Sequence, residues 1–300
     1  MKSGFIGIIG RPNVGKSTLL NCIVGEKVAI TSSKPQTTRN NIRGIYTKLA
    51  GENGEGVQMI FIDTPGIHKP RNKLGGFMTD MAKNTFREVD VLAFMVDGRL
   101  DQGPGDEYIV NMLRSVATPK ILIINKIDKL DPGEFRGIFD GYEKLGIFTH
   151  IFGICAIDGK NVDKLTRALE GFMAEGPMYF PEDMVTDYPE KFMVSEIIRE
   201  KTLMYLAEEV PHGVAVEIEG YSESESLVKI GAVIYCEKKS HKGIIIGKDG
   251  NKLKGIGKSA RLEIEALLGI KVFMEIWVKV RENWRDSDFA LSSLGYKRQI

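Results

Sequence analysis

The chain has 300 residues, and its 41 Lys and Arg nearly balance its 40 Asp and Glu, for a formal net charge of +1. This balance excludes a protein that binds nucleic acid through bulk charge alone, so any such surface must come from local clustering. The length is about right for two domains. The chain has 43% hydrophobic residues but no apolar run long enough to span a membrane, which predicts a soluble protein. It has no CxxC pair, which predicts reduced cysteines in a cytoplasmic protein.

Short apolar runs alternate with longer mixed segments over the first 175 residues. Such runs are typical of strands buried on both faces, and the connections between them are long enough for helices. We therefore predict a doubly wound α/β domain over residues 1–175, with ligands at the carboxyl ends of its strands. The predicted strands are 5–9, 57–62, 91–96, 121–124 and 150–154.

The order of elements changes after a proline-containing stretch at 176–189, which we interpret as a linker. A second, α+β domain is predicted over 190–300, because its order of elements is α-β-β-α-α-β. Its elements are an amphipathic helix over 192–210, strands at 214–220 and 227–236, a helical pair over 243–268, a strand at 271–281 and a short helix over 286–294.

A glycine-rich loop follows the first predicted strand and fits the pattern GxxxxGK[ST]. Backbone amides in such a loop surround the β-phosphate of a nucleotide at the start of a helix. Lys16 is expected to contact the β- and γ-phosphates, and the Ser17 hydroxyl is expected to bind Mg²⁺. The predicted phosphate-binding residues are Gly10, Asn13, Val14, Gly15, Lys16, Ser17 and Thr18.

Two further motifs follow later strands and complete a nucleotide site. In DTPG (63–66), Asp63 can hold Mg²⁺ through water and the Gly66 amide can meet the γ-phosphate. In NKID (125–128), which begins at Asn125, the Asp128 carboxylate can accept from N1–H and the 2-amino group of guanine. Adenine has neither donor and would leave that carboxylate unpaired, so the predicted base is guanine, with Lys126 laid over it.

Two elements of the site are less specific in sequence. Cys155-Ala156 stands where small GTP-binding proteins usually carry Ser-Ala, so a backbone amide there can recognise guanine O6, although the bracing hydroxyl is missing. The pair Thr37 and Thr38 offers a hydroxyl that could close over Mg²⁺ when a γ-phosphate is present. We favour Thr38, so the predicted metal ligands are Ser17, Thr38 and Asp63.

The residue after Gly66 predicts slow intrinsic hydrolysis. Many GTPases place a water-orienting glutamine there, whereas this chain has Ile67, which cannot position water. Asn13 could help to hold a monovalent cation such as K⁺ beside the phosphates, or it could serve only as a hydrogen-bonding loop residue. The predicted catalytic residues are Lys16, Thr38, Gly66 and Asn13.

A GxxG turn within the second domain predicts contact with single-stranded RNA. Paired glycines between two helices let a nucleic-acid backbone approach closely, as in KH domains. Residues 238–261 hold eight bases and one acid (8 − 1 = +7), whereas residues 182–225 hold twelve acids and three bases (3 − 12 = −9). This polarised charge favours phosphate binding on one face. The predicted RNA contacts are Lys242, Ile246, Gly247, Lys248, Asp249, Gly250, Lys252, Lys254 and Lys258.

Taken together, six motifs resemble the Era family of GTPases, which join a Ras-like GTPase domain to a type II KH domain. They are GRPNVGKS (10–17), QTTR (36–39), DTPG (63–66), NKID (125–128), IIIGKDG (244–250) and WVKVRENW (277–284). The resemblance implies GTP hydrolysis with Mg²⁺, binding of the 3′ end of 16S-type rRNA, and assembly of the small ribosomal subunit. It also implies peripheral contact with the membrane.

Two functional hypotheses remain open at this point. In the first, a monomeric ribosome-assembly GTPase gates RNA binding through its nucleotide state. In the second, a signalling GTPase uses the same basic segment to bind a protein or an anionic membrane. A preference for single-stranded over duplex RNA separates them, because both are electrostatic and both depend on salt.

Overall fold

The computed structural model describes residues 1–34, 36–51, 55–98, 103–206 and 210–296. The chain divides into two compact units, of which the first comprises residues 1–31, 38–71 and 75–187. The second comprises residues 32–37, 72–74 and 188–300. Among the described helices, none is both long enough and apolar enough to cross a membrane.

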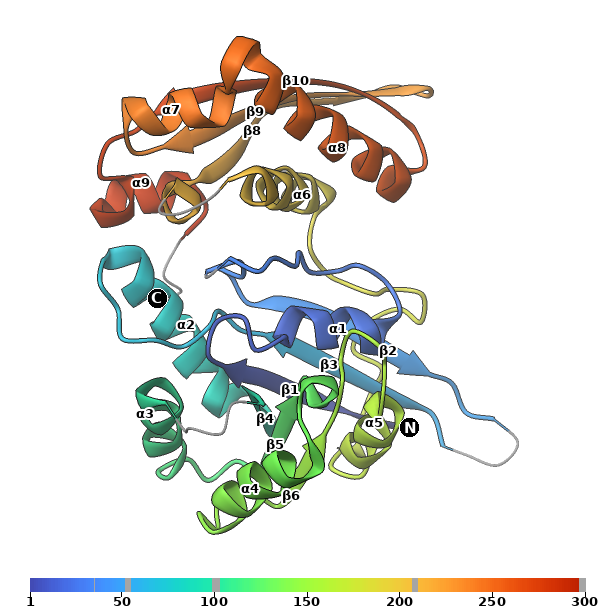
Figure 1. Ribbon diagram of the computed structural model, residues 1–300. Helices are drawn as coiled ribbons and strands as arrows, with labels where there is room; N and C mark the ends of the chain where they lie inside the picture. Colours follow the sequence, from blue (N-terminus) through green and yellow to red (C-terminus); the bar gives the residue numbers. More distant parts are fainter. Residues whose placement is uncertain (35, 52–54, 99–102, 207–209, 297–300) are drawn as a thin grey trace. The chain divides into compact units, whose positions relative to one another are not determined.

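A seven-stranded sheet forms the centre of the first unit (Figure 1). Strands β1, β3, β4, β5 and β6 pair in parallel, whereas β2 and β7 pair antiparallel to their neighbours. In spatial order the strands are β2 (Ile42–Lys48), β3 (Val57–Asp63), β1 (Lys2–Gly10), β4 (Val91–Asp97), β5 (Lys120–Asn125) and β6 (His150–Gly153), and β7 (Ala174–Glu175) pairs with β1.

Helices cover both faces of this sheet, which explains why its central strands are apolar throughout. Every residue of β3 and of β5 is buried. One face packs against α2 (Lys73–Glu88), α3 (Pro104–Leu113) and α4 (Pro132–Glu143). The helices α1 (Lys16–Val24) and α5 (Val162–Glu170) contact each other, and α1 packs on β1, β2 and β3. The predicted doubly wound α/β fold is confirmed.

β2 is not predicted from the sequence because it lies at the end of the sheet. Its burial alternates irregularly, with Arg43 exposed and the last three residues not fully buried. An antiparallel end strand with one covered side does not produce the continuous apolar run by which the other strands were recognised.

The stretch interpreted as a linker lies against the first unit over residues 176–187. The fully buried Gln58 accepts hydrogen bonds from the amides of Tyr179 (2.8 Å) and Phe180 (3.0 Å) and donates to the Phe180 carbonyl (2.9 Å). The Val185 carbonyl accepts from the amide of Ile45 on β2 (2.9 Å). The side-chain amide of Gln58 thus pairs with backbone hydrogen-bonding groups of a segment that has almost no regular secondary structure.

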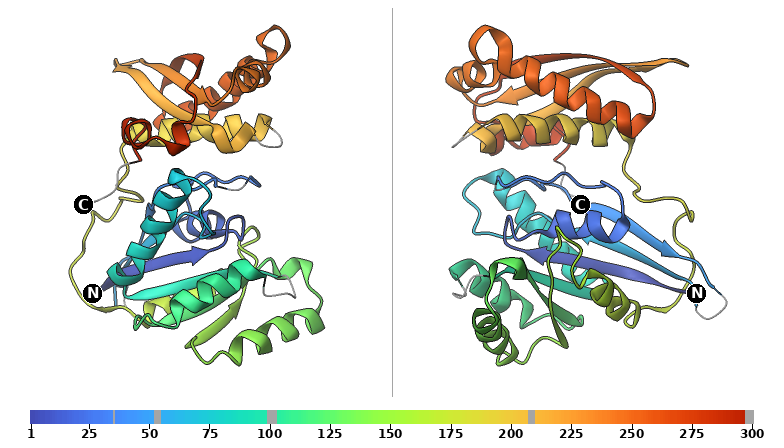
Figure 2. Two further views of the ribbon diagram at one scale, coloured as in Figure 1. Left: turned by 90° about the vertical axis from the view of Figure 1, so that its left-hand side faces the viewer. Right: turned by 45° about the vertical axis from the view of Figure 1, so that its right-hand side comes forward.

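The second unit is a three-stranded sheet with helices on one face (Figure 2). The strand β9 (Leu227–Cys236) pairs in parallel with β10 (Lys271–Val280) and antiparallel with β8 (Ala215–Glu223). The apolar core joins the sheet to three helices. These are α6 (Glu190–Tyr205), α7 (Lys239–Ile246) and α8 (Asn251–Leu268). The first of them ends at Tyr205, short of the predicted 210, and residues 207–209 of that prediction lie outside the described residues.

The two tryptophans occupy different environments. Trp277 does not pack against a helix, because it is 47% exposed on the face of β10 opposite to the core residues. The following tryptophan, Trp284, is fully buried and donates its indole N–H to the Gly213 carbonyl (2.9 Å). It lies in the short 3₁₀ turn Trp284–Asp286, before α9 (Asp288–Ser293).

Candidate nucleotide site and nucleic-acid groove

The phosphate loop runs from the end of β1 to the start of α1. Gly15, at the start of the helix, cannot be replaced by another residue without strain. Gly15 has φ +110°, and a Cβ there would lie 2.2 Å from the side-chain nitrogen of Asn125. Only glycine tolerates both that backbone conformation and that close approach. The loop amides and the first turn of α1 thus form the anion site that the sequence predicted.

Lys16 is a buried ammonium at the base of this loop. Its Nζ donates to the carbonyl oxygen of Arg11 (3.1 Å). Burial lowers the pKa of Lys16, and the Asp63 carboxylate opposes that shift. A buried cation whose hydrogen bond goes to a neutral carbonyl is well suited to a phosphate oxygen, which would supply the missing negative charge.

Three oxygen-bearing side chains meet beside Lys16. The hydroxyl of Ser17 donates to Asp63 Oδ2 (2.5 Å) and lies 2.9 Å from the Thr38 hydroxyl, which donates to the same Oδ2 (3.3 Å). Thr37 is not part of this cluster, because its hydroxyl donates to the Lys34 carbonyl (2.6 Å). Of the two threonines that the sequence offered, Thr38 is the one beside Ser17 and Asp63.

This cluster fits a magnesium ion. Asp63 is fully buried, and its second carboxylate oxygen has no hydrogen-bond partner among the described residues. Burial raises the pKa of Asp63, while Lys16 and the hydroxyls of Ser17 and Thr38 lower it. Hard oxygen donors with one unsatisfied carboxylate oxygen are what Mg²⁺ prefers in sites that keep several waters.

Asn125 connects the two loops that frame the site. Its Nδ2 donates to the Val14 carbonyl (2.8 Å), and its Oδ1 accepts from the Ala156 amide (3.0 Å). The next residue, Lys126, donates from Nζ to the Asn13 carbonyl (2.8 Å). The predicted phosphate-binding and base-binding residues are therefore brought together at the carboxyl ends of β1 and β5.

The thiol of Cys155 corrects one expectation from the sequence. We expected this residue to leave the base loop without its bracing hydroxyl, but Sγ donates to Asp158 Oδ2 (3.2 Å). Burial raises the pKa of Cys155, and the nearby carboxylate of Asp128 raises it further, so the thiol stays protonated. A sulfur donor thus braces the loop beside Asp128, the carboxylate predicted to read guanine.

Ile67 faces the core. It is fully buried in the cluster between β1 and the helices on that face, and its amide donates to the Gly10 carbonyl (3.0 Å). At the preceding Gly66, a Cβ would lie 2.6 Å from the Pro12 nitrogen. The DTPG turn therefore closes on the phosphate loop, and the Ile67 side chain lies in the core, where it cannot orient an attacking water.

The GxxG turn of the second unit joins α7 to α8. Gly247 has φ +73°, and a Cβ there would lie 2.6 Å from Cβ of Lys252. Asp249 and Gly250 also have left-handed backbones, with φ of 53° and 73°. Three left-handed residues in four explain why the two helices meet at a sharp turn.

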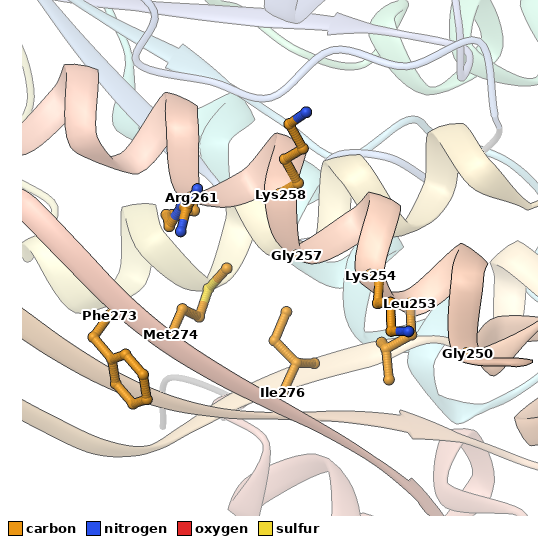
Figure 3. A pocket seen from close by; sticks show the side chains of 9 residues that line it. All are labelled: Gly250, Leu253, Lys254, Gly257, Lys258, Arg261, Phe273, Met274 and Ile276. Atoms are coloured by element: carbon orange, nitrogen blue, oxygen red, sulfur yellow. The ribbon is translucent and has the colours of Figure 1, made fainter.

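A groove of about 570 Å³ begins at this turn and runs between α8 and β10. Figure 3 shows cations on the helix side, and the side chains of Met274 and Ile276 reaching from the strand toward the helix. Lys254, Lys258 and Arg261 form no ion pair within the described part of the chain. The groove is lined by Gly250, Leu253, Lys254, Gly257, Lys258, Arg261, Phe273, Met274 and Ile276.

The sequence prediction covered only one wall of this groove. Three predicted RNA contacts line it, namely Gly250, Lys254 and Lys258. The strand wall was missed, because Met274 and Ile276 look like ordinary core residues when they are read along a strand. Those predicted contacts that do not line the groove are Lys242, Ile246, Gly247, Lys248, Asp249 and Lys252.

Comparisons with known proteins match both units. Residues 5–126 match a family model described as 50S ribosome-binding GTPase, and residues 209–285 match a KH domain model. GTPase Era from Alkaliphilus oremlandii is 56% identical over 98% of this chain and 99% of its own length. GTPase Era from Clostridioides difficile is 54% identical over 98% of both chains.

Two solved structures agree with the curated relatives. One is Era in complex with MgGDPNP and nucleotides 1506–1542 of 16S ribosomal RNA, with a TM-score of 0.93 and 40% identity over 99% of this chain and 100% of that chain. The other, at the same score, identity and coverage, is an Aquifex aeolicus Era variant bound to GDP·AlF₄⁻. With relatives this similar over its whole length, the chain belongs to the GTPase Era family.

Proposed function

We propose that this chain is a GTP-hydrolysing switch that binds the 3′ end of 16S-type rRNA and acts in assembly of the small ribosomal subunit. One observation carries the proposal: a single chain holds an oxygen cluster beside a phosphate loop and an unpaired cationic groove at a GxxG turn. A relative with 40% identity has been solved with a GTP analogue, Mg²⁺ and that RNA segment.

In the proposed mechanism the first unit binds GTP and orients its γ-phosphate. Lys16 would exchange its carbonyl partner for phosphate oxygens, and the Gly66 amide would donate to the γ-phosphate. Ser17, Thr38 and Asp63 would hold Mg²⁺, which when bound neutralises charge that develops on the phosphates. Loss of the γ-phosphate would release Thr38 and the residues around it.

The chain needs another means of aiding hydrolysis, because Ile67 is buried and cannot orient water. We propose that Asn13, in the phosphate loop, helps to bind K⁺ beside the phosphates. Single-turnover GTP hydrolysis in KCl, compared with NaCl at equal ionic strength, tests this. Asn13→Ala should abolish any K⁺ stimulation, whereas equal rates in the two salts would exclude a role for K⁺.

On the RNA side, the groove offers backbone contact at the GxxG turn, cations from α8 and apolar side chains from β10. Bases of a single strand can enter such a groove, whereas a duplex cannot open its bases to it. Lys254→Ala with Lys258→Ala should reduce the salt dependence of binding, log Kd against log[salt], by about 1.4 for two lost phosphate contacts. Lys191→Ala, on α6 and outside the groove lining, is the matched control.

The decisive experiment titrates a labelled single strand copied from the small-subunit rRNA 3′ end into protein loaded with GDP or with a GTP analogue. We expect tighter, sequence-selective binding in the analogue state, with a scrambled strand bound weakly in both. Equal affinity for the two strands would refute the rRNA assignment, and equal affinity in the two nucleotide states would refute the switch.

Parallel measurements with anionic vesicles and with duplex RNA separate the second hypothesis. A signalling GTPase that uses its basic helix on a membrane should bind anionic vesicles as tightly as it binds single-stranded RNA. We propose that the protein acts as a cytoplasmic monomer and that membrane contact is peripheral. Sedimentation at the concentrations used for RNA binding tests the monomer.

A further inference from the structure

Arg11 lies in the phosphate loop, but its side chain forms ion pairs with two other elements. Its Nε donates to Asp106 Oδ1 (2.7 Å), and its Nη2 donates to Asp97 Oδ1 (2.8 Å). Asp97 is the last residue of β4, and Asp106 lies in the first turn of α3. The three side chains are 21%, 11% and 3% exposed, respectively, so this is a largely buried cluster.

Asp97 also reaches the base loop. Its second oxygen, Oδ2, lies 3.7 Å from Nζ of Lys126. That same Nζ donates to the Asn13 carbonyl (2.8 Å). A single carboxylate thus stands between an arginine of the phosphate loop and the lysine of the guanine motif, and it pairs with both.

The packing around Arg11 favours an arginine side chain at this position. At Gly105, in the first turn of α3, a Cβ would lie 2.7 Å from Cδ of Arg11, so the aliphatic part of the arginine packs directly on the helix backbone. A planar guanidinium can bond two carboxylates at once through separate nitrogens, which an ammonium on a flexible stem does less well. The position therefore favours arginine over lysine.

The backbones of both loops need such support. Asn13 and Lys126 have left-handed conformations, with φ of 65° and 64°, which non-glycine residues rarely adopt without help from their surroundings. The ion pairs of Asp97 with Arg11 and Lys126, and the hydrogen bond from Lys126 to Asn13, stabilise these two backbone conformations.

We infer that Arg11 and Asp97 are positioning residues for nucleotide binding, which fix the spacing between the phosphate loop and the guanine-reading loop. Neither residue needs to touch the nucleotide for this role. Without the pair, the two loops would become ordered only when nucleotide binds. That ordering would lower the affinity for nucleotide, which would then dissociate faster. Asp106 anchors the same arginine to α3.

The test measures the rate at which a fluorescent GDP leaves the full-length protein in the presence of Mg²⁺. We expect Arg11→Met and Asp97→Asn each to accelerate release by roughly tenfold or more, as for loss of a buried hydrogen bond to a charged group. The double variant should be little faster than either single variant, because the residues act as a unit. Arg136→Met, which removes the exposed pair with Asp140, is the matched control and should leave release unchanged.

Stability must be measured beside these rates. Arg11→Lys keeps the charge but reaches only one carboxylate, so it should give an intermediate release rate even if Arg11→Met folds poorly. Unchanged GDP release in folded Arg11→Lys and Asp97→Asn, with only a lower unfolding temperature, would overturn the inference and leave a purely structural ion pair. Fully additive effects in the double variant would also overturn it.

Discussion

Ile67 occupies the position at which many GTPases carry a glutamine that orients the attacking water. In this protein it is fully buried, and its surroundings are the apolar core beneath the DTPG turn. A polar residue at this position would either place its amide in that core or force the turn to open. The absence of glutamine is therefore part of how the turn is packed.

Ile67→Gln should consequently fail to increase hydrolysis. We expect a loss of about 2–4 kcal/mol in the free energy of unfolding, from lost apolar burial and a buried amide. Single-turnover GTP hydrolysis and urea unfolding of the same samples measure the two effects. A faster rate in Ile67→Gln would show that the side chain can reach the γ-phosphate and would contradict the packing described above.

Cys155 offers a second test at the residue scale. Cys155→Val keeps the volume but removes the donor to Asp158 that braces the base loop, so GDP release should accelerate by about 3- to 10-fold, as for one net hydrogen bond. Cys155→Ser restores a stronger donor and should release GDP no faster than the parent. Cys236→Val, a buried cysteine in the other unit, is the control, and an equal effect there would refute the role of the thiol.

At the scale of elements, the GxxG turn has two glycines with different requirements. Both have φ of +73°, but only Gly247 lacks space, because a Cβ there would meet Lys252, whereas nothing lies within 4 Å of a Cβ at Gly250. Gly250→Ala should therefore cost about 1–2 kcal/mol in unfolding free energy, from backbone strain alone.

Gly247→Ala should cost more, since the contact with Lys252 adds to the strain, and it should weaken RNA binding further by moving the start of α8. Chemical unfolding and titration of a single strand, done on both variants, compare them. Equal losses at the two positions would mean that the close approach at Gly247 relaxes without effect.

The sequence predicted this architecture well where patterns are local. The apolar runs identified β1, β3, β4, β5 and β6, and the motifs after β1, β3, β5 and β6 identified loops of the nucleotide site. The sequence did not predict β2 or the strand wall of the groove, because the roles of these residues depend on contacts with residues elsewhere in the chain. The environment of Trp277 could not be predicted either: the alternation of β10 shows two faces, but it does not show which one the helices cover.

The ion pairs of Arg11 illustrate the same limit within the site. The phosphate loop was recognisable from its glycines and lysine, whereas Asp97 and Asp106 belong to no motif. Their role depends on β4 and α3 meeting the loop in space, which no spacing along the chain reveals.

At the scale of the whole molecule, two compact units with separate cores predict separate unfolding. The core of the second unit contains residues of α6, α7, α8 and its own sheet. In calorimetry of the full chain we expect two transitions, of which only one shifts upward with GDP and Mg²⁺. At a ligand concentration 100 times Kd, the stabilisation should be about 2.7 kcal/mol. One transition that shifts as a whole would show that the units unfold cooperatively.

The segment that follows β7 has a consequence for solubility. β2 is the last strand in the order of the seven-stranded sheet, and Val185, Thr186 and Asp187 bond to Ile45 and Arg43 along it. Two of those bonds occupy backbone groups of β2, the Ile45 amide and the Arg43 carbonyl, which would otherwise be open to a strand from another molecule. A fragment that stops near residue 175 would retain every predicted nucleotide-binding residue yet expose this edge and leave the amide oxygen of Gln58 unpartnered, so it should self-associate. A fragment extended to residue 187 should stay dispersed.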